Sequence, residues 1–491
     1  MNKENLKYLS KRLLSYLEKS YKPSFTIQWS ISKDNCMIPE INGRKLHSKY
    51  YALKEANKYI PLNNTSQKIA IGIGCLYHLI NYSADYKIIA ISDDPNFTLQ
   101  LLEKIDISKY FNPDNLIICF YDEIDSYFDY IKYNSIEPII NYTISEIFQE
   151  NTKSILNYLK NNISPKLLEY NTQRTFGKKW LTNSLNNLRD IKEYSSSPFI
   201  VNGKAILICG AGPSLDDNLQ KIIQNKKELC IIASDTALPI LLSHNILPQA
   251  VFTMDASPYS QYHYMEYLNN IRIFIDYTSS IKINKKNTSL LFSNFPLLKT
   301  LPIDKSLLPC IDTGFGNIGN TIISFFEKYA KDFPIITTGI DFGFKNKKTY
   351  SKSSYLDIYR ISKNTYLNSI ENIDCFLTYK NRILKKINGW ENNVLNETFS
   401  NKMDASIISL SDSPFVHCNK IINLNDFLKK QKTKEIEINF NYKELYKLDI
   451  KNELLNIPNS SLSKNLLSYK LFSRKKDVIS EIKGKIISIF K

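Results

Sequence analysis

Between residues 199 and 345, short apolar segments alternate with segments of helical character. The apolar segments are rich in Ile, Leu, Val and Phe, and they occupy residues 205–209, 229–234, 250–254, 271–276, 289–293 and 334–340. Strands that are apolar on both faces are usually buried on both sides, and strands that alternate with helices usually pair in parallel. We therefore predict an α/β fold in which this region forms a doubly wound, largely parallel sheet.

The first apolar segment runs directly into a glycine turn. Gly210 and Gly212 allow the chain to turn tightly, and Pro213 and Ser214 suit the start of a helix. The Ser214 hydroxyl is expected to be the N-cap of that helix or a donor to a phosphate. Free backbone N–H groups at a helix start attract an anion. The turn therefore predicts a phosphate site.

An acidic residue ends the second apolar segment. Asp235 follows the glycine turn by about 20 residues, where a carboxylate can accept from ribose hydroxyls, and Thr236 is assigned to the same pocket. The third glycine of a dinucleotide fingerprint is replaced by Leu215, and an ordinary strand–turn–helix is the alternative. We favour a nucleotide pocket made by Gly210, Gly212, Pro213, Ser214, Asp235 and Thr236.

Further polar groups are expected at the same edge of the sheet. Asp255 and Asp341 each follow a predicted strand, and a second glycine loop carries Gly316, Asn317 and Gly319. Ligands of open α/β sheets bind beyond the carboxyl ends of the strands. The loop can bring N–H groups close to phosphate or carboxylate oxygens, or it is simply a tight turn. We assign Asp341 and the loop to the sugar side of the nucleotide.

Two residues are candidates for a catalytic base. Asp255 is the first choice, and His263 is the second because an imidazole titrates near neutrality. A packed, hydrogen-bonded histidine is the alternative for His263. The chain has no D-x-D pair that would hold a divalent ion on a nucleotide diphosphate, and its five histidines are scattered. We predict no metal ligands and no required cofactor.

The remainder of the chain predicts a multidomain organisation. Segments 68–75, 86–95 and 115–120 form a second strand–glycine–helix unit, for which a structural role is favoured over a second ligand site. Asn42-Gly43 indicates a hairpin, and the polar stretch 345–400 indicates a lid or acceptor-facing insertion. The predicted parts are an N-terminal helix (1–24), an N-terminal Rossmann-like domain (25–139), a helical connector (140–198), a central domain (199–425) and a helical C-terminal region (426–491).

Composition limits the classes of function. The net charge of +16 accompanies a richness in Lys, Asn and Ile but no recognisable nucleic-acid module, so no nucleic-acid partner is expected. The eight cysteines lie far apart, which is typical of a reducing compartment. No apolar run is long enough for a transmembrane segment, and no signal peptide is expected. We predict a cytoplasmic protein.

Several motifs together resemble one family. G-A-G-P-S-L-D (210–216), the stretch 233–248 that begins A-S-D-T-A-L-P, V-F-T-M-D-A-S (251–257) and G-I-D-F (339–342) are similar to the central domain of the motility-associated factor (Maf) glycosyltransferases. The likeness extends over about residues 20–425. It implies tandem Rossmann-like domains, of which the central one is sialyltransferase-like, that is, GT-A-like. Two departures concern the acceptor side: Ile340 replaces a glutamine, and 409–415 lacks the expected glycines.

The resemblance implies a reaction and its partners. It implies transfer of a nonulosonic acid of the pseudaminic or legionaminic type from a CMP-activated donor to Ser or Thr of flagellin. The same domain signature resembles hydroxymethylpterin pyrophosphokinases of the MptE-like type, so ATP-dependent phosphate transfer is the alternative. That reaction needs Mg²⁺, whereas transfer from a CMP-sugar can proceed without a bound metal. A non-catalytic flagellar assembly factor is the third alternative.

Overall fold

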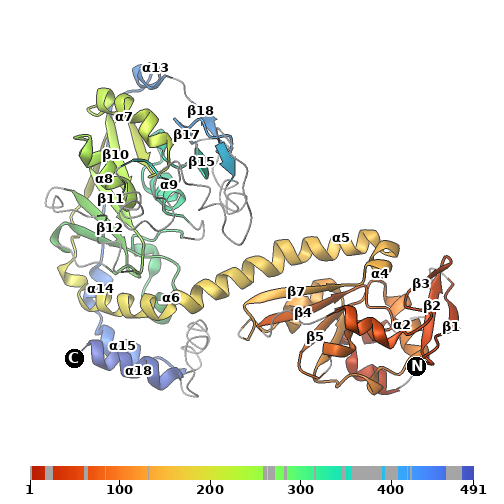
Figure 1. Ribbon diagram of the computed structural model, residues 1–491. Helices are drawn as coiled ribbons and strands as arrows, with labels where there is room; N and C mark the ends of the chain where they lie inside the picture. The colour runs from red at the N-terminus through yellow and green to blue at the C-terminus, as the bar shows by residue number, and fades with distance from the viewer. Residues whose placement is uncertain are drawn as a thin grey trace. The chain divides into compact units, whose positions relative to one another are not determined.

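A computed structural model gives the fold of the chain (Figure 1). The residues that it describes are 3–16, 26–59, 65–82, 84–130, 132–257, 263, 271–280, 285–313, 317–345, 350–352, 354, 390–392, 407–416, 418–420, 423–459 and 478–490.

The chain divides into two compact units, Met1–Thr175 and Phe176–Lys491. We call them the N-terminal unit and the C-terminal unit. The boundary falls within the 26-residue helix α6 (Ser164–Arg189), inside the predicted connector. The finer five-part division of the chain stays a prediction.

The N-terminal unit contains a four-stranded parallel sheet in the order β6-β5-β4-β7. Its strands are β4 (Ser66–Ile71), β5 (Ile88–Ile91), β6 (Leu116–Cys119) and β7 (Ser135–Ile140). Helix α2 (Pro95–Lys104) packs on one face, whereas α3 (Ile124–Tyr127), α5 (Gln149–Tyr158) and the beginning of α6 pack on the other. The predicted Rossmann-like unit is confirmed, with β7 as an additional strand. A short helix α4 (Tyr142–Ile147) follows β7.

The beginning of the chain differs from the predicted single helix. A 3₁₀ turn η1 (Lys3–Tyr8) and a short helix α1 (Lys11–Ser15) are separated by Leu9 and Ser10. Leu9 forms a bridge with Ile118 of β6, and the Ser10 N–H donates to the Ile118 carbonyl (2.8 Å). Pairing with the sheet edge therefore replaces one helical turn, and the prediction of a continuous helix is wrong.

A small antiparallel sheet precedes the parallel one. It consists of β1 (Gln28–Ile31), β2 (Met37–Ile41) and β3 (Arg44–Lys45). Asn42 and Gly43 connect the last two strands with φ of 52° and 76°. Both residues are therefore left-handed, as a type I′ hairpin turn requires, and the predicted hairpin is confirmed.

The C-terminal unit is built on an eight-stranded parallel sheet in the order β13-β12-β11-β10-β9-β14-β17-β18. The strands that match the predicted apolar segments are β9 (Ala205–Cys209), β10 (Leu229–Ser234), β11 (Ala250–Thr253), β12 (Arg272–Asp276), β13 (Thr288–Leu291) and β14 (Ile335–Thr338). Two short strands, β17 (Ile408–Ser409) and β18 (Asn419–Lys420), complete the sheet. The predicted doubly wound sheet is confirmed.

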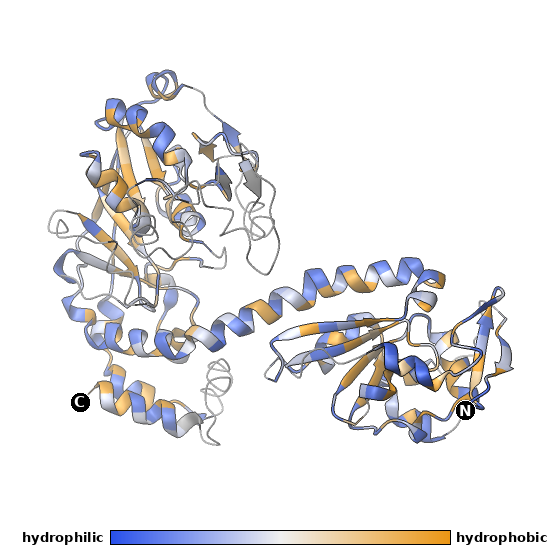
Figure 2. Ribbon diagram, in the orientation of Figure 1, coloured by the Kyte–Doolittle hydropathy of each residue, from blue (hydrophilic) through white to orange (hydrophobic). Residues whose placement is uncertain are grey.

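Helices cover both faces of this sheet. Helices α7 (Ser214–Asn225), α8 (Leu238–Ser243) and α13 (Leu424–Lys429) pack on one face. The C-terminal half of α6 and helix α9 (Ile318–Tyr329) pack on the other. Figure 2 shows the strands between these layers as strongly hydrophobic. The three layers leave the carboxyl ends of the strands as the edge where connecting loops meet.

The C-terminal region is only partly helical. Strand β19 (Lys434–Ile438) pairs antiparallel with β8 (Phe199–Gly203), so the helical prediction is wrong there. Helices α14 (Lys443–Lys447), α15 (Ile450–Asn456) and α18 (Val478–Ile489) follow. Helix α18 lies against α6: Arg189 donates to the Ile489 carbonyl (3.2 Å), and Lys178 pairs with Glu481 (3.2 Å). Among the described helices, none has the length and apolarity needed to span a membrane.

Candidate functional site

In the sheet of the C-terminal unit, the order in which the chain adds strands reverses between β9 and β14. From β9 the chain continues through β10 to β13 on one side, and β14 then lies on the other side of β9. The neighbouring strands β9 and β14 therefore lie at a switch point of the strand order. In open α/β sheets this switch point is where ligands bind.

Two glycines allow these strand ends to touch. Gly339 has a φ of 68°, and a Cβ atom there would lie 2.1 Å from the Gly210 carbonyl oxygen. A Cβ atom on Gly210 would lie 2.3 Å from the Gly339 carbonyl oxygen. The Gly212 N–H donates to that same Gly339 oxygen (2.8 Å). Because real Cβ contacts are longer, neither position tolerates a side chain without a backbone shift. Gly339 is a structural requirement that the sequence analysis did not single out.

The Asp341 carboxylate lies at the start of α7. Its Oδ2 accepts from the Ser214 N–H (2.9 Å), and a Cβ atom on Gly212 would lie 2.3 Å from it. The Ser214 hydroxyl accepts from the Gly339 N–H (2.8 Å) and does not cap α7. The predictions of a Ser214 N-cap and of free N–H groups at Gly212 and Ser214 are therefore wrong. A carboxylate of the protein already occupies the position expected for a phosphate.

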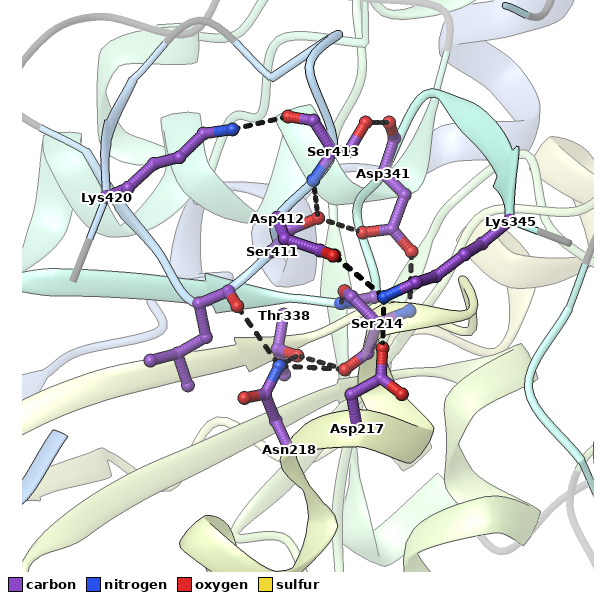
Figure 3. A network of polar contacts seen from close by, with 12 residues as sticks. Ser214, Asp217, Asn218, Thr338, Asp341, Lys345, Ser411, Asp412, Ser413 and Lys420 are labelled. Atoms are coloured by element: carbon purple, nitrogen blue, oxygen red, sulfur yellow. Dashed lines mark hydrogen bonds and ion pairs between the residues drawn. The ribbon is translucent and has the colours of Figure 1, made fainter. Parts of the chain in front are cut away.

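Serines from the loop after β17 hold Asp341 in place (Figure 3). The Ser411 hydroxyl donates to Asp341 Oδ1 (2.5 Å), and the Ser413 hydroxyl donates to the Asp341 carbonyl (2.7 Å). Asp341 is only 3% exposed, and burial raises the pKa of its carboxyl, whereas hydrogen bonds from Ser214 and Ser411 oppose that rise. These serines lie in the segment where the sequence lacks the expected glycines.

A lysine bridges the two sides of this network. Lys345 Nζ contacts Asp217 of α7 (2.8 Å) and Asp412 of the β17 loop (2.8 Å), as Figure 3 shows. Burial lowers the pKa of Lys345, but the two ion pairs outweigh it and the net shift is upward. The two ion pairs of Lys345 therefore connect the first turn of α7 to the loop after β17, which carries Ser411 and Ser413.

Two residues of the predicted insertion, Ser351 and Lys352, contact the glycine turn and the first turn of α7. The Ser351 N–H donates to the Ala211 carbonyl (2.9 Å), and the Ser351 hydroxyl donates to the Gly212 carbonyl (2.6 Å). The Lys352 N–H donates to Asp216 (3.1 Å). Most of 345–400 lies outside the described residues, so its role as a lid stays a prediction.

The second glycine loop lies against the residue that follows Gly339. The Asn317 side chain caps α9 by accepting from the Asn320 N–H (2.9 Å). A Cβ atom on Gly319 would lie 2.8 Å from Ile340 Cδ1, and one on Gly210 would lie 2.9 Å from Ile340 Cγ1. The Ile340 side chain therefore packs against both glycines. Gly316 lies outside the described residues.

Asp235 is a buried acid at the end of β10. Its Oδ1 accepts from the Thr236 N–H (2.7 Å), and its Oδ2 accepts from the Thr253 hydroxyl (2.7 Å). Burial raises the pKa of its carboxyl, and the nearby imidazole of His263 acts in the opposite direction. The structure thus brings Asp235 and His263 together. Asp255, by contrast, is exposed at the end of β11 and accepts from the Ser257 N–H (2.8 Å).

Among the described residues, Gly210, Asp235, Asp255 and Asp341 follow strands of this one sheet, and Pro213, Ser214, Asn317 and Gly319 lie at the starts of α7 and α9. Sequence reasoning missed Lys345, Ser351, Ser411 and Ser413. Their only signal was proximity in the chain to predicted strand ends. Within the described residues, no group of three or more His, Cys, Asp or Glu is arranged to hold a metal ion.

These features define an α/β protein with two Rossmann-like units and a network of polar side chains at the switch point of the second. More particularly, the chain has the fold of a Maf glycosyltransferase. The structure of the Maf glycosyltransferase from Magnetospirillum magneticum AMB-1 superposes with a TM-score of 0.51 at 12% identity, and the match covers 98% of this chain and 88% of that one.

Two further likenesses concern parts of the chain. Residues 182–347 match the family model of the MptE-like 6-hydroxymethylpterin diphosphokinases. A protein of Treponema pallidum (strain Nichols), described as an uncharacterized protein, is 29% identical over 128 residues, which are 26% of this chain. The match spans 58% of the length of that relative.

Proposed function

We propose that the protein is a glycosyltransferase that uses a nucleotide-activated sugar. The observation that carries this proposal is the likeness in fold to a Maf glycosyltransferase along nearly the whole chain, with both units included. A further support is that predicted site residues lie at the β9–β14 switch point, where open α/β sheets bind their ligands. The donor is proposed to be a CMP-activated nonulosonic acid, and the acceptor a Ser or Thr hydroxyl of flagellin.

The proposed location of the donor phosphate is argued from charge. Asp341 lies at the start of α7, and Asp217 and Asp412 lie nearby with Lys345 between them. Asp217 and Asp412 are exposed, but a phosphate at the start of α7 would meet the buried Asp341 carboxyl at close range, which is unfavourable. We therefore assign the uncharged nucleoside to the glycine turn. The phosphate or the sugar carboxylate is assigned to the Gly316–Gly319 loop at the start of α9.

The acceptor hydroxyl must lose a proton as the bond between sugar and phosphate breaks. In the proposed mechanism Asp255 is the base, and its exposure supports access to a protein acceptor. His263 is the second candidate, and it lies near the buried Asp235 carboxyl. In either case the proton moves from the acceptor oxygen to the base, the oxygen bonds to the anomeric carbon, and CMP leaves.

The match of residues 182–347 to the MptE-like family supports a second candidate function, transfer of pyrophosphate from ATP to a hydroxymethylpterin. That match covers about a third of the chain, whereas the likeness to the Maf structure covers 98% of it. The extent of the likeness therefore favours sugar transfer.

One experiment separates the two candidates. The full chain is incubated with purified flagellin and a CMP-activated pseudaminic or legionaminic acid, and in parallel with hydroxymethylpterin, ATP and Mg²⁺. Sugar transfer predicts CMP release and an increase in the intact mass of flagellin. The proposal is wrong if AMP and a pyrophosphorylated pterin form instead, or if calorimetry shows binding of ATP with Mg²⁺ in preference to CMP.

The base is tested in the same assay. Asp255→Asn and His263→Ala are compared with the unchanged chain, and loss of a general base is expected to lower the transfer rate by about 100-fold or more. The proposed base is wrong if both variants glycosylate flagellin at the full rate.

A further inference from the structure

Buried polar atoms without a partner gather at the carboxyl edge of the sheet in the N-terminal unit. Among the described residues, Asp93 Oδ1, Asn96 Oδ1 and Ser145 Oγ are buried and have no hydrogen-bond partner. The Asp93 and Ser145 residues are only 3% and 7% exposed. Buried polar atoms in folded proteins nearly always have a partner, so such a group of atoms indicates a bound water, ion or ligand.

These atoms lie at the switch point of their sheet. From β4 the chain proceeds to β5 and β6 on one side, and β7 lies on the other. Asp93 follows β5, Ser145 belongs to α4 after β7, and Gly72 turns the chain after β4. A Cβ atom on Gly72 would lie 3.0 Å from Ser145 Oγ. The edge therefore has the topology of a ligand site.

The backbone N–H groups of the turn are already used. The Ile73 N–H donates to Asp93 Oδ2 (3.1 Å), and the Cys75 N–H donates to His47 Nε2 (2.9 Å). His47 is fixed in turn by Glu55, whose Oε2 lies 2.6 Å from His47 Nδ1. A phosphate would find no free donors at these two positions, and it would meet the Asp93 carboxyl. The arrangement therefore disfavours a phosphorylated group in contact with the turn.

The protonation of Asp93 identifies the chemistry that fits. Burial raises the pKa of Asp93 to about 7, and N–H groups of Ile73 and Gly72 limit the rise. Both forms are therefore populated near neutrality. The carboxylate needs a donor at Oδ1, whereas the protonated acid offers one. A hydroxyl group can donate or accept, and so it satisfies Asp93 in either form as well as Ser145.

We propose that this edge is a second ligand site, which binds the neighbouring hydroxyls of an uncharged sugar ring. A ribonucleoside and a simple glycoside both carry such a pair of neighbouring ring hydroxyls. Asn96, at the start of α2, supplies a further acceptor and is half-buried, so the site lies immediately below the surface. This site is in the other unit from the proposed transfer chemistry and does not depend on it.

The test is hydrogen–deuterium exchange of the full chain. The probes are adenosine, cytidine and methyl glucoside, with 2′,3′-dideoxyadenosine as the probe without ring hydroxyls. Each is used at about 10 mM, which detects even millimolar dissociation constants. At least one diol is expected to slow exchange of the amides of residues 72–76 severalfold, and the dideoxynucleoside is expected to have no effect. Protection by nucleosides alone assigns a ribose ligand, and protection by the glucoside assigns a hexose.

A matched pair of serine variants tests whether the diol binds at Ser145. Ser145→Ala removes the unpartnered hydroxyl and is expected to weaken binding about fivefold, the value of one hydrogen bond of about 1 kcal/mol. Ser154→Ala removes an exposed hydroxyl on α5, which donates to the Glu150 carbonyl, and is expected to bind as the unchanged chain does.

Three results would overturn the proposal. One is the absence of protection with every diol, and another is equal protection by the dideoxynucleoside. The third is a high-resolution structure of crystals soaked in the diols in which an ordered water alone contacts Asp93 Oδ1.

Discussion

At the scale of single residues, two buried histidines have environments that predict opposite effects on stability when each is replaced by leucine. His47 and His78 are both buried histidines of the N-terminal unit. The ring nitrogens of His47 are paired with Glu55 and with the Cys75 N–H. Neither ring nitrogen of His78 has a partner among the described residues, and burial holds the pKa of His78 well below its usual value. A buried polar group without a partner destabilises the folded state.

His78→Leu is therefore expected to raise the free energy of unfolding of the N-terminal unit by about 1–2 kcal/mol. His47→Leu is expected to lower it, because Glu55 and Cys75 lose their partner. Thermal unfolding of both variants provides the measurement. A lower midpoint for His78→Leu would mean that a bound group pairs with this imidazole.

Asp93 predicts a pH dependence of stability. Its pKa of about 7 in the folded protein exceeds the value of about 3.9 in an unfolded chain, so the folded state binds the proton more tightly. The stabilisation is complete below about pH 4 and is lost as the pH rises to about 7. Relative to Asp93→Asn, the unchanged chain should lose stability over that window. Equal pH dependence of the two midpoints would contradict the raised pKa.

Gly339 is expected to tolerate alanine poorly. Its left-handed backbone alone predicts a loss of about 1 kcal/mol, and the contact of a Cβ with the Gly210 carbonyl adds a backbone clash. Gly43→Ala is the matched control, since Gly43 has a similar φ of 76° but open space around the Cβ position. Urea unfolding should show a clearly larger loss for Gly339→Ala. Similar losses for the two variants would show that the strand ends separate easily.

At the scale of elements, α6 anchors the loops that surround the candidate site. Asn187 Nδ2 donates to the carbonyls of Tyr277 (2.8 Å) and Ser279 (3.0 Å), and its Oδ1 accepts from Tyr194 (2.6 Å). Asn183 likewise donates to the carbonyls of Thr278 and Ala256. The helix thereby fixes the loops after β11 and β12, and the β11 loop carries Asp255.

Asn187→Ala is expected to destabilise the C-terminal unit by about 2–4 kcal/mol, because it leaves two carbonyls and a hydroxyl without their partner. Asn186→Ala, one position along the same helix, is the control and should change stability by less than about 0.5 kcal/mol. Chemical unfolding measures both. An equal effect of the two substitutions would remove the anchoring role of α6.

The elements also show what sequence can predict. The strands β9 to β14 were predictable because burial on both faces gives uninterrupted apolar segments. The pairing of β19 with β8 was not, because the two strands are remote in sequence. The alternation of Ile436 and Ile438 with Glu435 and Glu437 is itself typical of a half-buried strand, which the helical prediction overlooked. The position of Asp341 at a strand end was predictable. Its contact with α7 was not, because that contact depends on β14 lying beside β9.

At the scale of the whole molecule, the two units have separate cores and are expected to unfold in two transitions. His78→Leu should move one transition and Asn187→Ala the other, as measured by calorimetry. A single transition that both variants move would mean that α6 couples the units into one cooperative structure.

In both units a carboxylate from a neighbouring strand contacts the backbone of the glycine turn, Asp93 at Ile73 and Asp341 at Ser214. This has a practical consequence for crystallography. Crystals grown from ammonium sulfate should show no sulfate at either turn, although helix starts after glycine turns commonly attract such ions. Heavy-atom labelling with oxyanions such as tungstate should fail at both places for the same reason.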